Sequence, residues 1–406
     1  MRILYISYDG LLDPIGASQI LPYIKNIASI SQSFYVVSFE KKNRYDAGGS
    51  VLLQELNLQG ISWRPLTFSM RFGFFGKFYD LLKMYAVSLQ LMLQYKLEIV
   101  HARGHVAGQI GSFLKLILRC KFIFDFRGLW VDERVNKGGW DLSKNFDKLQ
   151  YKLFKIVERT IINRSDRIIV LTEAVIDELM NLGNISKDHI SVIPCCADFD
   201  HFSPHSDLKK KEFRLMLGIK SDDLVLGYLG SIGPMYRFES YVKLVVLSRS
   251  KHRNVRGLIV TQDAPNARKI LSSLTHSYDQ NLFIVASASR EEVINYINIF
   301  DVMINFLTSS YARLATSPTR NAESFACGIP VICNQGIGDV DKHTSILDSG
   351  LTIPDLSDQS LLGAMNELEV IRSKGGLRLR VEAKKIFALE IAEQRYKNVY
   401  SDIFID

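Results

Sequence analysis

The chain has 406 residues, 47% of them hydrophobic and 23% charged, which is enough for two soluble α/β domains with separate cores. It contains no uncharged apolar run of about 18 residues, so a membrane-spanning helix is excluded, and Asp9 interrupts the first apolar run too early for a secretory signal. A net charge of +7 suits nucleotide phosphates, lipid phosphates or nucleic acid without choosing among them. Its 5 cysteines lack paired spacing, which indicates a reducing cytoplasm and argues against structural zinc.

Short apolar, β-rich segments alternate with helical stretches in the first half of the chain. They predict strands at residues 2–7, 34–39, 98–101, 121–126, 167–171 and 190–193. A loop at residues 8–17 holds Gly10 and Gly16, and we expect Ser18 to N-cap a helix that runs to about residue 29. Strands that alternate with helices predict parallel βαβ units.

The proline-bounded stretch at residues 194–204 breaks this alternation and reads as an interdomain hinge. The alternation then restarts, with strands predicted at residues 224–229, 258–261, 282–285, 301–306 and 330–333. We therefore expect two doubly wound, Rossmann-like parallel sheets facing across a cleft, with domains at residues 1–203 and 204–387. A last helix within residues 388–406 would cross back to the first domain. Ligands bind such folds at the carboxyl ends of the strands.

The most informative segment covers residues 313–339, which include the letters SPTRNAESFACGIPVI. Ser317 and Pro318 predict a helix start, and Gly328 predicts its end. An arginine beside a helix N-terminus is typical of a phosphate site, and a carboxylate one turn deeper suits the hydroxyls of a ribose. Arg320 and Glu323 stand at these positions. The alternative is an ordinary cap with a surface ion pair.

This segment resembles the donor-site signature of family 4 of the retaining glycosyltransferases, which have the GT-B fold. The match consists of Ser317, Pro318, Thr319, Arg320, Glu323, Ala326, Gly328, Pro330, Val331 and Ile332, followed by Gly336, Gly338 and Asp339. Three further stretches also resemble segments of this family. One leads into the hinge, one forms the loop at residues 230–239, and one covers residues 289–292, which also read as a capping box. The resemblance therefore extends over nearly the whole chain.

The resemblance implies a nucleotide-sugar donor site and assigns roles in it. Glu323 would bind the ribose and Arg320 the diphosphate. The remaining implied donor residues are Gly16, Gly230, Ser231, Arg313, Ser317 and Thr319. The chain departs from the pattern at Ala315, where many members carry a glutamate that contacts the sugar, and at Ser231 and Tyr236, near a usual arginine and lysine. These departures leave the identity of the sugar open.

A second group of charges follows a predicted strand, in the letters FDFRGLWVDERVNKGGW at residues 124–140. It resembles a D-x-R-G-x-W-x-D-E-R segment of bacterial members, at the place where others carry an active-site histidine. We expect Asp125 and Arg127 to face the acceptor or the donor phosphate as catalytic candidates, with His105 as a third. The alternatives are a salt-bridged loop cap for the segment and a structural, hydrogen-bonded role for His105.

Glycosyl transfer builds negative charge on the leaving phosphate, and that charge must be stabilised. Asp198 and Asp200, like Asp339 and Asp341, match the Asp-x-Asp pattern that holds a metal in other transferases, but both pairs read as loop residues. We therefore expect arginines and helix N–H groups to take the place of a metal ion. We expect no cofactor besides the donor, and retention without a protein nucleophile.

Residues 71–95 begin with aromatics interleaved with Arg71, Lys77 and Lys83 and continue as an apolar helix. This pattern suits the surface of an anionic membrane, or else an ordinary core helix with a solvated edge. The resemblance favours peripheral contact at the inner face of the cytoplasmic membrane. It implies lipid-linked saccharide acceptors in lipopolysaccharide, O-antigen or capsule synthesis.

Other functions remain open on the sequence alone. An epimerase or a phosphorylase of the same fold, or a non-catalytic GT-B subunit, would share the nucleotide site. Nucleic-acid binding has no recognisable motif to support it, because the positive charge is spread along the chain.

Overall fold

The computed structural model describes residues 1–69, 73–252, 254–274 and 282–404. The chain forms two compact units. Unit 1 comprises Met1–Pro194, Leu314–Thr316 and Leu389–Asp406. Unit 2 comprises Cys195–Arg313 and Ser317–Ala388.

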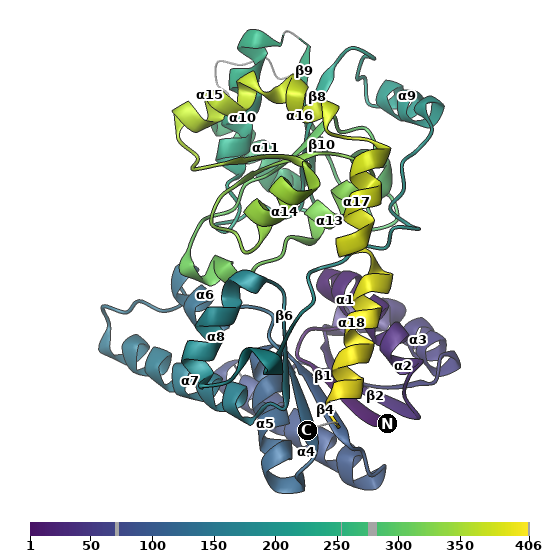
Figure 1. Ribbon diagram of the computed structural model, residues 1–406, viewed down its shortest axis with the longest axis vertical. Helices are drawn as coiled ribbons and strands as arrows, with labels where there is room; N and C mark the ends of the chain where they lie inside the picture. Colours follow the sequence, from purple (N-terminus) through teal and green to yellow (C-terminus); the bar gives the residue numbers. More distant parts are fainter. Residues whose placement is uncertain (70–72, 253, 275–281, 405–406) are drawn as a thin grey trace. The chain divides into compact units, whose positions relative to one another are not determined.

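Unit 1 is built on a seven-stranded parallel sheet in the order β3-β2-β1-β4-β5-β6-β7 (Figure 1). Its strands are β1 (Arg2–Ser7), β2 (Ser33–Glu40), β3 (Ile61–Thr67), β4 (Ile99–Arg103), β5 (Lys121–Asp125), β6 (Arg167–Val170) and β7 (Ile190–Val192). All of them except β3 were predicted from their apolar runs. Most of these runs are buried, and the edge strand β7 is half-buried. β3 escaped prediction because it is an edge strand that contains Arg64 and Pro65 and alternates buried with exposed side chains.

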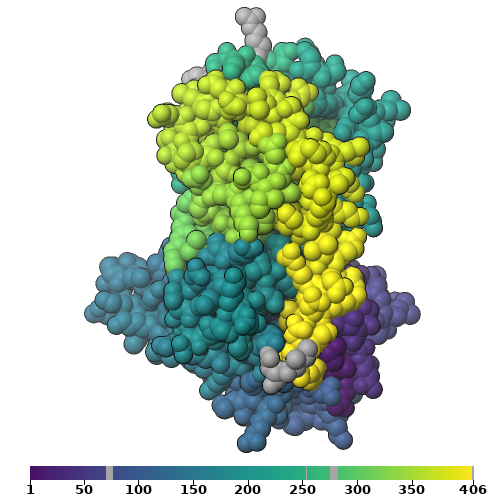
Figure 2. Space-filling model, in the orientation of Figure 1, coloured from purple at the N-terminus to yellow at the C-terminus, as the bar shows by residue number. Residues whose placement is uncertain are grey.

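Helices cover both faces of this sheet. They are α1 (Pro14–Gln19), α2 (Leu21–Ala28), α3 (Lys42–Leu58), α4 (Gly73–Gln94), α5 (Gly104–Leu118), α6 (Trp130–Asn136), α7 (Asn145–Arg164), α8 (Ile176–Gly183) and α18 (Leu389–Asp402). α5 packs between α4 and α7, and α8 packs on α7. The C-terminal helix α18 buries Ala392, Tyr396, Val399 and Tyr400 and packs on α2, so C-terminal side chains lie beside N-terminal ones in Figure 2.

The predicted helix start at Ser18 is wrong. α1 begins at Pro14, whose fixed φ suits the first turn of a helix, and the Ser18 hydroxyl donates to the Pro14 carbonyl at 2.8 Å. Gly16 lies within this helix, and a Cβ there would come within 2.0 Å of the Gly10 carbonyl oxygen. Close backbone approach therefore requires glycine at this position.

Unit 2 is built on a six-stranded parallel sheet in the order β10-β9-β8-β11-β12-β13. Its strands are β8 (Leu224–Leu229), β9 (Val255–Val260), β10 (Phe283–Ala286), β11 (Val302–Asn305), β12 (Val331–Asn334) and β13 (Gly350–Ile353). Its helices are α9 (Asp207–Met216), α10 (Phe238–Lys251), α11 (Ala264–Leu274), α12 (Val293–Ile297), α13 (Thr319–Ala326), α14 (Val340–Leu347), α15 (Asp358–Asn366), α16 (Leu368–Ser373) and α17 (Leu377–Phe387). The short edge strand β13 was not predicted.

Two doubly wound parallel α/β sheets confirm the predicted fold class. In each sheet the strand order reverses at one point, between β1 and β4 in unit 1 and between β8 and β11 in unit 2. Ligands of such sheets bind outside the carboxyl ends of the strands at this switch point. Within the described part of the chain, no helix combines the length and the apolar character needed to cross a bilayer.

Candidate functional site

The helix predicted to hold the diphosphate lies at the switch point of unit 2. α13 follows β11, and Gly328, with φ 74°, ends it as predicted. The predicted N-cap is wrong: Pro318 occupies that position in extended conformation. The Ser317 hydroxyl instead accepts a hydrogen bond from the Cys195 backbone N–H at 3.1 Å, so it fixes the segment that precedes α13 to the backbone of the predicted hinge.

Arg320, in the first turn of α13, meets the loop that follows β8. A Cβ at Gly230 would lie 2.5 Å from the Arg320 Nη2 atom, so the absent side chain makes room for the guanidinium group. The central carbon of the Arg320 guanidinium lies 4.7 Å from the centre of the Tyr236 ring. Ser231 is exposed, and its carbonyl accepts a hydrogen bond from the Tyr228 hydroxyl at 2.7 Å. The structure thus brings together Arg320, Gly230 and Ser231.

Glu323, one turn deeper in α13, is buried, and its Oε1 atom lies 3.5 Å from Nη1 of Arg290. Burial raises the pKa of the Glu323 carboxyl, and the positive charges of Arg290 and Arg320 oppose that rise. Arg290 was missed because its neighbours form the predicted capping box. Ser289 N–H donates to Glu292 Oε2 at 2.8 Å and Glu292 N–H donates to the Ser289 hydroxyl at 3.3 Å, which confirms that box.

Two buried amides hold α13 on the sheet. Asn305, the last residue of β11, donates from Nδ2 to Oδ1 of Asn321 at 2.7 Å. Asn321 in turn donates to the Cys333 sulfur of β12 at 3.4 Å. Buried, paired amides of this kind fix a helix in one position because breaking the pair would leave a buried polar group unsatisfied. The first turn of α13 is therefore held at the carboxyl end of the strands.

The remaining donor candidates of unit 2 lie along the same segment. Arg313 is buried in the 3-10 helix Tyr311–Ala315, and its carbonyl accepts from the Gly338 N–H at 2.9 Å. Thr319 opens α13 and is half-buried. Ala315 is buried. Because this residue is alanine, no carboxylate stands at the position where many family members carry glutamate.

In unit 1 the candidates Asp125 and Arg127 lie at the carboxyl end of β5. Arg127 Nη1 lies 3.4 Å from Asp125 Oδ1, and Oδ2 of the same carboxylate lies 3.9 Å from His101 Nε2 and 4.0 Å from Arg103 Nη1. Burial would raise the pKa of Asp125, but Arg127, His101 and Arg103 outweigh it and hold that pKa at about 2. Sequence reasoning missed His101 and Arg103.

His105 belongs to a different cluster. Its Nε2 lies 2.7 Å from Oε1 of the buried Glu158, which also pairs with Lys155 at 2.5 Å. The His105 ring stacks on Trp130 with ring centres 5.8 Å apart. These contacts match the structural alternative for His105, and its catalytic role stays a prediction.

The charges that follow Arg127 serve local packing. Asp132 accepts from the Tyr151 hydroxyl at 2.8 Å, and the Arg134 guanidinium lies over the rings of Trp130 and Trp140. The charged segment therefore divides, with Asp125 and Arg127 at the sheet edge and the later residues fastening α6 to α7. This division agrees with the salt-bridged loop cap for its second half.

The Asp-x-Asp pairs were also placed. The Asp198 carboxylate accepts hydrogen bonds from the N–H groups of Asp200 and His201, both at 2.9 Å, and so caps its own turn. The loop prediction is wrong for the second pair: Asp339 is the N-cap residue of α14, and Asp341 lies in the first turn of that helix. Asp341 is half-buried, and burial raises the pKa of its carboxyl. Over the described ranges no group of three His, Cys, Asp or Glu side chains is placed to hold a metal ion.

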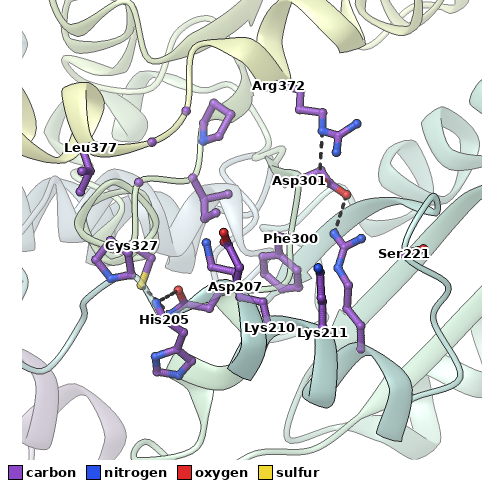
Figure 3. Close-up of a pocket in the computed structure, with 18 residues that line it drawn as sticks. His205, Asp207, Lys210, Lys211, Ser221, Phe300, Asp301, Cys327, Arg372 and Leu377 are labelled. Carbon is purple, nitrogen blue, oxygen red and sulfur yellow. Dashed lines mark hydrogen bonds and ion pairs between the residues drawn. The ribbon is translucent and has the colours of Figure 1, made fainter.

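Unit 2 also contains a cavity of about 710 Å³ near the amino ends of its strands, opposite the predicted donor site (Figure 3). Cys327 and Gly328 at the C-terminal end of α13 contribute to its lining, as do Lys210 and Lys211. Asp301 accepts from Arg214 Nη2 at 2.8 Å and pairs with Arg372 Nε at 3.1 Å across this lining. Because it adjoins the far end of α13, this cavity is separate from the predicted donor site.

We predict that Asp125 stabilises unit 1 in a pH-dependent way. Its folded pKa of about 2 lies below the ordinary value of 3.8, so the carboxylate stabilises the fold above pH 4, and this contribution is lost as the pH falls towards 2. Asp125→Asn should lower the free energy of unfolding by on the order of 2 kcal/mol at pH 7, and by progressively less from pH 4 downwards. Urea unfolding followed by circular dichroism measures this, with the exposed Asp46→Asn as control. A loss that does not depend on pH would contradict the prediction.

Comparisons with known proteins agree with this architecture. Residues 49–201 match the family model described as Glycosyltransferase Family 4, and residues 209–383 match that of Glycosyl transferases group 1. Among curated proteins, a D-inositol 3-phosphate glycosyltransferase of Mycobacteroides abscessus is 25% identical over 243 residues, which cover 58% of this chain and 52% of that protein. The chain thus spans about half the length of the curated relatives it matches.

Two solved structures share the fold over almost their whole length. Anabaena HepE, in complex with UDP and glucose, has a TM-score of 0.73 at 16% identity, covering 99% of this chain and 100% of that one. WaaG, a glycosyltransferase involved in lipopolysaccharide biosynthesis, has a TM-score of 0.68 at 12% identity, covering 98% and 99%. With both family models matched in sequence along two doubly wound sheets, the chain belongs to the family 4 glycosyltransferases of the GT-B fold.

Proposed function

We propose that this protein is a glycosyltransferase that moves a sugar from a nucleoside diphosphate onto a saccharide acceptor. The observation that carries the proposal is the convergence of Arg320, the Gly230 loop and Glu323 at the switch point of unit 2. These residues combine a fixed positive charge, a glycine that makes room for that charge and a buried carboxylate one helical turn away.

The diphosphate and the ribose of a nucleotide donor each have a matching partner in this arrangement. The first N–H groups of α13 and the positive end of its dipole suit a diphosphate, and Arg320 adds a forked donor. Glu323 can accept two ribose hydroxyls once its carboxylate is ionised, a state that Arg290 favours. HepE, with the same fold, was crystallised with UDP and with UDP-glucose, which supports a uridine diphosphate sugar as the donor class.

We further propose that transfer retains the anomeric configuration and proceeds without a metal ion. The bond from the sugar C1 to the diphosphate oxygen breaks, the acceptor oxygen bonds to C1 from the same face, and the acceptor proton passes to the leaving phosphate. The guanidinium groups of Arg320 and Arg313 and the helix N–H groups would stabilise the growing negative charge. Retention rests on the family resemblance, and metal independence on this set of positive charges.

Two acceptor classes have support from the comparisons. WaaG acts in lipopolysaccharide biosynthesis, which supports a saccharide acceptor, lipid-linked in a surface polysaccharide pathway. The curated relatives are named for inositol 3-phosphate, which supports a small phosphorylated polyol instead. Screening both acceptor classes with one donor set distinguishes them.

The donor assignment predicts that Glu323→Ala weakens UDP binding at least about tenfold, because a buried carboxylate that accepts two hydroxyls is lost. Titration calorimetry of the purified chain measures the affinity, with the exposed Glu212→Ala as a matched control. Wild-type turnover of nucleotide sugars is then assayed with EDTA present. Unchanged UDP affinity in Glu323→Ala would remove the donor site from α13.

The same assays separate the rival functions. Conversion of the donor without an acceptor-linked product would indicate an epimerase, and binding without turnover across both acceptor classes would indicate a non-catalytic subunit. Turnover that EDTA abolishes would overturn metal independence while leaving the donor site in place.

We also propose peripheral attachment to an anionic membrane through the outer face of unit 1. On α4, Phe78, Tyr79 and Leu82 are exposed beside the exposed Lys77. On α7, a stripe at helical spacing is 53–70% exposed and consists of Phe146, Leu149, Leu153 and Ile156. Arg71, part of the predicted membrane segment, lies outside the described residues.

Charge on α7 favours a lipid surface. Lys148, Lys152 and Arg159 are exposed along one edge of the apolar stripe. Apolar side chains next to a cationic edge are typical of helices that lie in the interface of an anionic bilayer. Because α5 packs against both α4 and α7, the two exposed stripes belong to one helical layer.

This proposal predicts that the purified chain sediments with vesicles containing phosphatidylglycerol and much less with pure phosphatidylcholine vesicles. Leu149→Glu combined with Leu153→Glu should lower the bound fraction several-fold, because the charges oppose insertion. The control is Leu215→Glu with Met216→Glu on α9, where both side chains are even more exposed than Leu149 and Leu153. Equal sedimentation of wild type and the α7 variant would contradict it.

A further inference from the structure

Arg103 occupies the switch point of unit 1. It is the last residue of β4 and pairs in register with Ser7 of β1 and Asp125 of β5. Its side chain is only 3% exposed. The position is the one at which open parallel sheets bind ligands, and nothing in the donor site of unit 2 explains a buried arginine here.

Most donors of the Arg103 guanidinium are unsatisfied. Within the described residues, Nε and Nη1 have no hydrogen-bond partner, and Nη2 reaches Gln19 Oε1 only at 3.4 Å. Nη1 lies 4.0 Å from Asp125 Oδ2, within ion-pair range but beyond hydrogen-bonding distance. Because arginine keeps its proton, a buried guanidinium without acceptors is costly and calls for a partner.

Arg103 shares its nearest carboxylate with a second arginine. Arg127 pairs with Asp125 and also donates from Nη2 to Gln19 Oε1 at 3.0 Å. Burial lowers the pKa of His101, so this ring is neutral at pH 7. Burial raises the pKa of the tyrosines packed on the cluster, Tyr5, Tyr396 and Tyr400, so they too are neutral. None of these rings supplies Arg103 with a negative charge.

We propose that Arg103 and Arg127, joined through Gln19, form a subsite for a phosphate or carboxylate group of a substrate. In a planar guanidinium, Nε shares one edge with Nη2, and Nη1 shares the end with Nη2. An anionic oxygen at either place would therefore meet a donor of Arg103 that has no partner among the described residues. Such a group supplies the acceptors that Nε and Nη1 of Arg103 lack.

This inference rests on the proposed glycosyltransferase function, which supplies two sources of the anion. The group belongs either to the diphosphate of the donor or to an anionic substituent of the acceptor. Arg103 is then a specificity-determining residue, because a substrate that lacks the anion would leave the guanidinium buried and unsatisfied.

The test is a pair of calorimetric titrations on the full chain and on its Arg103→Gln and Arg103→Lys variants. The donor arm titrates UDP. The acceptor arm titrates glucose 6-phosphate, inositol 1-phosphate and glucuronic acid into UDP-saturated protein, with glucose as the uncharged reference. The exposed Arg119→Gln is the matched control.

We expect Arg103→Gln to weaken one arm about tenfold or more, with partial rescue in Arg103→Lys and no effect of Arg119→Gln. A loss confined to UDP assigns the anion to the donor. A loss confined to the charged acceptor probes assigns it to the acceptor. If Arg103→Gln does not fold, Arg127→Gln, whose side chain is 14% exposed, replaces it.

Unchanged affinity in both arms, with wild-type UDP binding intact, would overturn this subsite and leave the proposed function standing. The subsite is also overturned if the charged acceptor probes do not bind the wild-type protein and Arg103→Gln leaves the UDP affinity unchanged. If wild-type protein binds no UDP, the proposed function itself fails. The two failures are therefore distinguishable.

Discussion

The proposed donor site depends on the position of the Arg320 guanidinium group. Arg320 can lie against Gly230 because that residue has no side chain. Arg320 itself belongs to the first turn of α13, where the helix has free N–H groups. The fold therefore holds a fixed positive charge at the positive end of a helix dipole before any ligand arrives. Asn305 and Asn321 keep the helix in this position from beneath.

Both units use the same constraint in different ways. Parallel strands end at one edge, so residues distant in sequence meet where the strand order reverses. In unit 2 this edge gathers a loop glycine, an arginine and a buried carboxylate, which suits a nucleotide. In unit 1 it gathers Asp125, His101, Arg103 and Arg127, and the two arginines share the Asp125 carboxylate. A transferase needs two substrates, and each unit presents a polar edge of its own.

Local sequence pattern located most of the strands and the C-terminal end of α13. Buried apolar runs located almost every strand, and Gly328 marked the end of the helix because only glycine readily adopts its φ of 74°. Contacts between distant residues were not accessible. The Ser317 hydroxyl serves the Cys195 N–H, 122 positions away, and His105 bonds Glu158, 53 positions away. Arg103 was overlooked for the same reason: that its guanidinium lacks hydrogen-bond partners becomes visible only when β5 and α1 are placed beside it.

The most direct measurement is hydrogen–deuterium exchange of the full chain with and without UDP. The account predicts slower exchange in peptides covering residues 317–323 and 229–236, because a diphosphate would engage the amides at the start of α13 and in the Gly230 loop. Protection confined to peptides around Lys210 and Lys211, with the α13 amides unchanged, would contradict it by placing the nucleotide in the cavity near the amino ends of the strands.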